Sequence, residues 1–102
     1  MLNRVYIANS FFSKLFGLIP KKYLNKEEGL LIYNCNSIHS MWMRYCIDAI
    51  FLNSSFKVLF ILENLKPFKF SPTIAGSKFV LEIKGGLARQ LNISVGDKLF
   101  LQ

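Results

Sequence analysis

The chain lacks any apolar run long enough to cross a membrane, which requires about 20 consecutive apolar residues. Its first apolar run, at residues 5–8, is too short for the apolar part of a signal peptide. The next apolar patch is interrupted by Lys14 and ends at Pro20. We therefore expect no membrane span, and a soluble, cytoplasmic protein whose thiols stay reduced.

Cysteine is scarce, because the chain holds only Cys35 and Cys46. Two cysteines are too few for the disulfide framework of a small secreted protein. Together with His39, the single histidine, they could bind a soft metal, with Asp48 or water as the fourth ligand. Their order, Cys-x3-His-x6-Cys, is not a usual zinc spacing, and buried cysteines commonly act as small hydrophobic residues. We predict no bound metal and no cofactor.

Acidic residues are also few, with six against thirteen basic ones and a net charge of +7. Such a charge can steer a protein towards nucleic acid or an anionic membrane. The lysines are scattered, however, and Lys21 and Lys22 are the only adjacent pair. The absence of a basic cluster favours a solvated, lysine-rich surface.

Hydrophobic residues make up 52% of the chain, and 102 residues are enough for one core. We therefore predict a single domain over residues 1–102. Runs rich in β-branched and aromatic residues predict strands. The predicted strands are 2–8, 30–33, 47–52, 56–62, 78–83 and 98–101.

Two of these runs, 47–52 and 56–62, are joined by three residues and predict a hairpin. Both are almost entirely apolar, so both faces of the hairpin should be covered. We predict a mainly β fold, a compact antiparallel β-sandwich or barrel. One short helix should follow the first strand, between Asn9 or Ser10 and Pro20, and a short helical turn should lie near the C-terminus, at 87–91.

The loop 64–77 has no periodicity and contains Pro67 and Pro72. A loop this long in a compact domain is often functional. Its lysines, Lys66 and Lys69, alternate with Phe68 and Phe70 in a pattern that could bind single-stranded nucleic acid. A half-buried edge segment shows the same alternation, and no RNA-binding signature accompanies it.

Three charged residues, Arg44, Asp48 and Glu82, lie in otherwise apolar stretches, where an unpaired charge is costly. One interpretation is a buried ion pair that fixes the sheet. The other is an anion-binding Arg44 beside a wall formed by Trp42. Both require the same desolvated setting, so the sequence leaves both open.

Nucleophilic catalysis has little support in the sequence. His39 could activate Ser37, which would share its face on a strand, and Asp48 could orient the imidazole. Cys35 would lie about 13 Å from His39 along a strand. No oxyanion loop is visible, and the paired Glu27 and Glu28 fall in a polar turn.

Residues 37–52, SIHSMWMRYCIDAIFL, resemble the signature block of the family called domain of unknown function 192. The resemblance continues upstream at 28–32, EGLLI, and downstream at 80–86 and at Gly96 and Asp97. It implies a compact, mainly β fold but no reaction. The characteristic residues of the family fall on Cys35, His39, Met43, Arg44, Asp48, Glu82 and Asp97.

The chain departs from the family pattern at three positions. Cys46 stands where many relatives have proline, so a site built on Cys35 and Cys46 is not a family device. Asn53 replaces a frequent aspartate, and Lys84 replaces another proline. These changes affect local turns more than the fold.

For function we predict a non-catalytic accessory module that binds a small anionic ligand or a protein partner in an anion-accepting groove. The loop 66–70 would line this groove, and its candidate binding residues are His39, Trp42, Met43, Arg44, Asp48 and Glu82. One alternative is a small hydrolase-like or metal-dependent enzyme that uses His39 with Asp48. A second alternative is single-stranded nucleic-acid binding.

Overall fold

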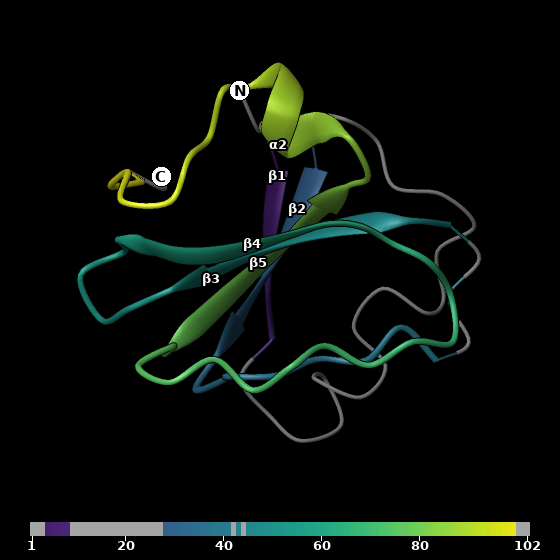
Figure 1. Cartoon of the computed structure of the whole chain (residues 1–102), viewed down its shortest axis with the longest axis horizontal. Helices are drawn as coiled ribbons and strands as arrows, with labels where there is room; N and C mark the ends of the chain where they lie inside the picture. The colour runs from purple at the N-terminus through teal and green to yellow at the C-terminus, as the bar shows by residue number, and fades with distance from the viewer. Residues whose placement is uncertain (1–3, 9–27, 42, 44, 100–102) are drawn as a thin grey trace.

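The computed structural model describes residues 4–8, 28–41, 43 and 45–99. Five strands form one sheet in the order β1-β2-β5-β3-β4 (Figure 1). The strands are β1 (Arg4–Ala8), β2 (Glu28–Tyr33), β3 (Ile47–Leu52), β4 (Val58–Leu65) and β5 (Phe79–Lys84). A single helical turn, α2 (Leu87–Gln90), follows β5.

The predicted mainly β fold is confirmed. Each of the neighbouring pairs β2–β5, β5–β3 and β3–β4 is antiparallel. The exception to the antiparallel prediction is β1, which pairs with β2 in parallel. The α2 turn lies within the segment for which the sequence predicts one, whereas the helix predicted after the first strand falls outside the described residues.

Strand β3 lies between β5 and β4 in the sheet. All six of its residues are buried, as the continuous apolar pattern predicts. The turn to β4 is closed by Asn53, whose Oδ1 accepts hydrogen bonds from the N–H groups of Ser55 and Lys57. An asparagine at this position suits a tight connection because its short side chain mimics a backbone acceptor.

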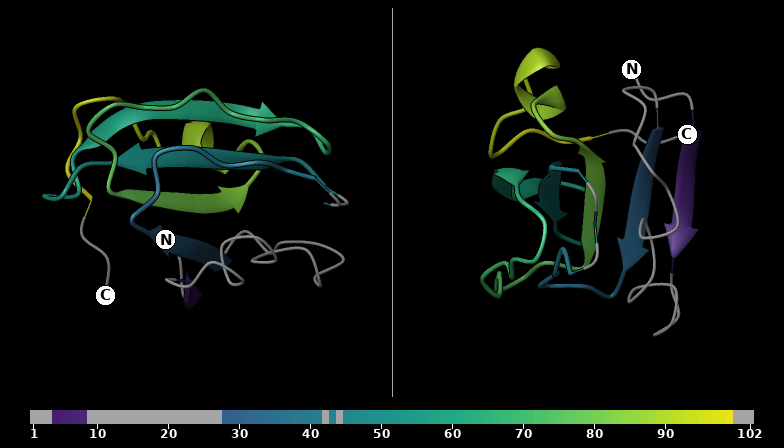
Figure 2. Two further views of the ribbon diagram at one scale, coloured as in Figure 1. Left: turned by 90° about the horizontal axis from the view of Figure 1, so that it is seen from below. Right: turned by 90° about the vertical axis from the view of Figure 1, so that its right-hand side faces the viewer.

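The two faces of the sheet carry separate hydrophobic clusters, because successive side chains of a strand point to opposite faces. One cluster packs against α2 and the segment 91–99. The other packs against residues of 35–43 and Ile74. We call these the helix face and the strap face. Figures 1 and 2 show α2 on one side of the strands and the extended segments on the other.

The cover of the strap face consists of two segments that run side by side, 34–41 and 66–78 (Figure 1). We call the second segment the strap. Hydrogen bonds join them from Cys35 N–H to Lys78 O, from Ile74 N–H to Asn36 O and from Ser71 N–H to Ile38 O. An isolated antiparallel bridge joins His39 to Phe70. The sequence predicts an irregular loop here, and the structure shows one that is tied down along its length by these bonds.

The last predicted strand, 98–101, is represented among the described residues by one bridge, between Lys57 and Lys98. No helix in the part of the chain that the structure describes is long and apolar enough to cross a membrane.

Candidate functional site

Ser40, which is fully buried, anchors the strap to the segment 34–41. Its hydroxyl donates to Lys66 O and accepts from Lys69 N–H at 2.9 Å. Its backbone N–H donates to Lys69 O at 2.8 Å, and its carbonyl accepts from Phe68 N–H at 2.9 Å. One serine therefore fixes the backbone at three strap positions, 66, 68 and 69. Sequence reasoning missed this role, for which the only signal was a small polar residue within an apolar stretch.

Phe68 is held in the left-handed backbone region, with φ of 63°. This conformation is unusual for a bulky residue and persists only where its surroundings impose it. Here the Ser40 bonds impose it. Phe68 is nevertheless 53% exposed, so the strained backbone presents an aromatic side chain at the surface.

Phe70 is the most exposed of the large hydrophobic residues described, at 73%. Its ring centroid lies 6.2 Å from that of His39, with the ring planes tilted by 54°. His39 is half-buried, and its Nδ1 accepts a hydrogen bond from Met41 N–H at 3.2 Å. This bond restrains the imidazole and leaves Nε2 as its other polar atom.

Two exposed lysines, Lys66 and Lys69, lie on either side of Phe68 along the strap. The strap and the segment 34–41 contain no aspartate or glutamate. We call His39, Lys66, Phe68, Lys69 and Phe70 the aromatic–lysine patch. Its positive charges are therefore not neutralised by a carboxylate from either segment of the cover.

Asp48 lies on the helix face and is completely buried. Its Oδ1 accepts from the N–H groups of Asn64 at 2.8 Å and Gly86 at 3.0 Å. Its Oδ2 accepts from Ala88 N–H at 2.8 Å. Three backbone donors thus bind the carboxylate, which joins β3 to the end of β4 and to the start of α2.

Glu82 lies on the strap face, since its partners across the sheet are Leu30 and Ala49. It is only 3% exposed. Desolvation by burial raises the pKa of Glu82 from 4.5 to about 8, so the group is mostly un-ionised at neutral pH.

The predicted site residues therefore do not all converge. His39, Met43 and Glu82 belong to the strap side, where Met43 is buried in the core cluster, whereas Asp48 lies on the helix side. Trp42 and Arg44 lie outside the described residues, so their place in the groove stays a prediction. Within the described segments, no group of three His, Cys, Asp or Glu side chains is arranged to hold a metal ion.

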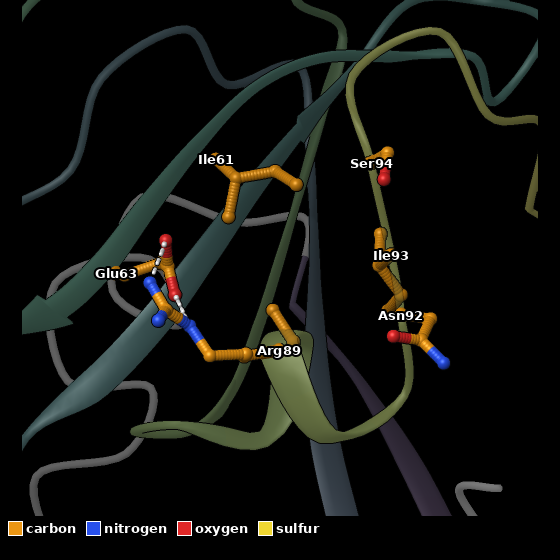
Figure 3. A pocket seen from close by; sticks show the side chains of 7 residues that line it. Ile61, Glu63, Arg89, Asn92, Ile93 and Ser94 are labelled. Carbon is orange, nitrogen blue, oxygen red and sulfur yellow. Dashed lines mark hydrogen bonds and ion pairs between the residues drawn. The ribbon is translucent and has the colours of Figure 1, made fainter.

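A hollow of about 200 Å³ lies beside α2, away from the patch (Figure 3). Glu63 and Arg89 form an ion pair across it, with Arg89 Nε 3.3 Å from Glu63 Oε1. Both side chains are solvent-exposed, Glu63 at 39% and Arg89 at 82%, so the pair contributes little to stability. The two charges satisfy each other, and the other polar side chains that line the hollow are those of Asn92 and Ser94.

The amino-acid sequence of this chain is similar to those of known proteins. The model of the DUF192 family, described as an uncharacterized ACR, matches residues 2–101. A UPF0127 protein of Thermococcus sibiricus is 32% identical, over 94% of this chain and 64% of the relative. The chain thus spans less than two thirds of that relative. A UPF0127 protein of Pyrococcus furiosus is 33% identical, over 93% of this chain and 84% of the relative.

Two solved structures are similar. A protein of unknown function from Novosphingobium aromaticivorans gives a TM-score of 0.87 at 27% identity, covering 95% of this chain and 74% of that one. A Sinorhizobium meliloti protein described as a candidate transcription regulator gives a TM-score of 0.82 at 22% identity, with 92% and 78% covered. The second likeness shows the fold alone.

Replacing the buried carboxylate should destabilise the fold. In Asp48→Asn, one oxygen becomes an NH2 group that faces a backbone N–H, so at least one of three bonds is lost. We expect a loss of about 2–3 kcal/mol in the free energy of unfolding, measured by urea denaturation. Asp97→Asn is the matched control, because the exposed Asp97 accepts only from Ser94 N–H among the described side-chain contacts. Equal losses in the two variants would contradict the anchoring role of Asp48.

Glu82 should make stability depend on pH. Between pH 4.5 and about 8 the unfolded chain releases the proton that the folded chain keeps. The free energy of unfolding should therefore fall by about 1.4 kcal/mol per pH unit as pH rises through this window. Glu82→Gln should remove this slope, as urea denaturation at several pH values under reducing conditions will show.

The control for this measurement is Glu63→Gln, which changes an exposed carboxyl group. It should leave the slope almost unchanged. Because the test compares slopes, a constant destabilisation by the buried amide that Glu82→Gln introduces does not disturb it. Parallel curves for wild type and Glu82→Gln would contradict the burial-raised pKa.

Proposed function

Since the chain belongs to the DUF192 family of uncharacterised proteins, we propose its function from its own surface: a non-catalytic binding module for an anionic ligand. The binding surface is the aromatic–lysine patch. The observation that carries the proposal is that Ser40 fixes the backbone of a strap that presents exposed phenylalanine and lysine side chains and contains no carboxylate.

A pre-arranged surface binds well because less conformational entropy is lost on binding. The backbone at Phe68 and Lys69 is already held by hydrogen bonds to Ser40. Lys66 and Lys69 supply positive charge beside Phe70 and His39. An anionic ligand with flat or apolar groups would therefore meet both kinds of contact at once.

The alternative of catalysis by His39 with Asp48 finds less support. A catalytic pair must lie within hydrogen-bond reach. Asp48 accepts three backbone hydrogen bonds on the helix face, whereas His39 belongs to the cover of the opposite face. The separation favours binding over a hydrolase built on these two residues. We also keep the prediction from the sequence that Trp42 and Arg44 contribute to the binding surface.

Removing the two patch lysines should weaken anion binding. Inorganic tripolyphosphate, titrated in low salt and followed by amide chemical shifts, should perturb His39, Lys69 and Phe70. The double variant Lys66→Ala/Lys69→Ala should bind it about tenfold more weakly, since each exposed ion pair contributes on the order of 0.2–1 kcal/mol.

The matched control is Lys57→Ala/Lys98→Ala, which removes the same charge from two exposed lysines bridged at the opposite end of β4. It should change the affinity much less. An equal loss in both double variants would indicate a net-charge effect and would contradict the patch as the binding surface.

A further inference from the structure

The chemistry of the patch narrows the class of anionic ligand. Apart from the two phenylalanines, the exposed residues of the cover are lysines, small polar residues such as Asn36, Ser37 and Thr73, and the small residues Pro72, Ala75 and Gly76. Lysine and serine are depleted in protein–protein interfaces, whose buried centres are more apolar. Exposed rings set among lysines are instead typical of surfaces that bind single-stranded nucleic acid, where rings stack on bases and lysines contact phosphates.

The ring of Phe70 is available for stacking. Phe70 is 73% exposed, and its neighbour His39 is tilted by 54° at 6.2 Å rather than stacked face to face on it. Phe68 is 53% exposed on a backbone that its bonds already hold. A flat base can therefore approach the ring of Phe70 without displacing another ring. The backbone of the strap is already held by hydrogen bonds, so it needs no further ordering on binding.

Phosphate groups would find donors beside these rings. Lys66 and Lys69 lie on either side of Phe68 in sequence and are both exposed. Because His39 Nδ1 accepts from Met41 N–H, the neutral imidazole carries its proton on Nε2, where it can donate to a phosphate oxygen. The cover adds no carboxylate that would repel the phosphates.

A lipid surface fits less well. Recognition of anionic membranes usually uses clusters of about four to eight basic residues, and the patch has two lysines. Duplex DNA requires an element that enters a groove, such as a helix or a two-stranded ribbon. The strap is an irregular loop with turns at residues 67–68 and 75–76, and neither it nor the segment 34–41 forms a helix or a regular strand.

We propose that the ligand of the aromatic–lysine patch is a short stretch of single-stranded nucleic acid, bound by stacking on Phe70 and by phosphate contacts to Lys66, Lys69 and His39. This inference rests on the proposed anion-binding function and names its ligand. It implies little sequence preference, since every base offers a flat face.

The test is fluorescence anisotropy with a labelled dT12 oligonucleotide in low salt, using the full chain. Phe70→Leu keeps an apolar side chain but removes the aromatic face, and Phe70→Tyr keeps the face. Stacking predicts at least tenfold weaker dT12 binding for Phe70→Leu and near wild-type binding for Phe70→Tyr. Tripolyphosphate binding should be unchanged in both, because it needs no ring. Thermal unfolding checks that the variants fold.

Lysine contacts are tested by the salt dependence of the same binding. Each lost phosphate contact should lower the slope of log K against log salt by about 0.7. Lys66→Ala/Lys69→Ala should therefore lower it by roughly 1.4, given two contacts. The control Lys57→Ala/Lys98→Ala should leave the slope close to that of the wild type.

The outcomes separate this inference from the proposed function. If tripolyphosphate binds the patch but dT12 does not bind, or if Phe70→Leu binds dT12 like the wild type, the nucleic-acid proposal is wrong and anion binding stands. If poly-L-glutamate or phosphatidylglycerol vesicles bind through Phe70 while dT12 does not, the nucleic-acid proposal is equally wrong, and the ligand is an acidic protein segment or a membrane surface. If neither tripolyphosphate nor dT12 binds, both proposals fail.

Discussion

The hydrogen bonds of Ser40 are the constraint on which the candidate site depends. Both faces of this sheet carry an apolar cluster, so each must be covered. On the strap face the cover contains no helix among the described residues, so its backbone groups need partners elsewhere. The Ser40 hydroxyl and backbone provide several of them. The same bonds that make this cover possible also determine where Phe68 and its neighbours are presented.

Asp48 has the corresponding role on the helix face. A helical turn of four residues gains little stability from its own hydrogen bonds, and its N-cap residue, Gly86, makes no side-chain capping bond. Asp48 supplies acceptors from β3 for Gly86 and Ala88. Each face therefore has a polar residue that holds its cover in place. Asp48 ties α2 to β3, whereas Ser40 ties the two segments of the strap-face cover to each other. The two anchors differ in chemistry, one a neutral hydroxyl and the other a carboxyl group.

The strands could be predicted from sequence because β-branched and aromatic runs are bounded by turn residues. The hairpin at Asn53 is an example, and β4 extends to Leu65 rather than ending at 62. Which of the candidate site residues lie on the same face of the sheet is harder to predict. Strand β3 is buried throughout, so its apolar pattern does not alternate and gives no sign that Asp48 faces α2. For Glu82, the flanking Leu81 and Ile83 are equally buried, and only the register places it opposite Leu30 and Ala49.

The strap could be predicted only in part, because its bonds to 34–41 are long-range and leave no local pattern in the sequence. Binding residues often lie on such connections, which a rigid scaffold positions. Here Ser40 bonds to the backbone of Lys66 and Lys69 and leaves both lysine side chains exposed. These positioning bonds join uncharged groups, on which screening by ions acts weakly, whereas it acts strongly on the exposed lysine charges. The shape of the patch and its charge are thus set by separate groups, so a lysine can change without disturbing the frame.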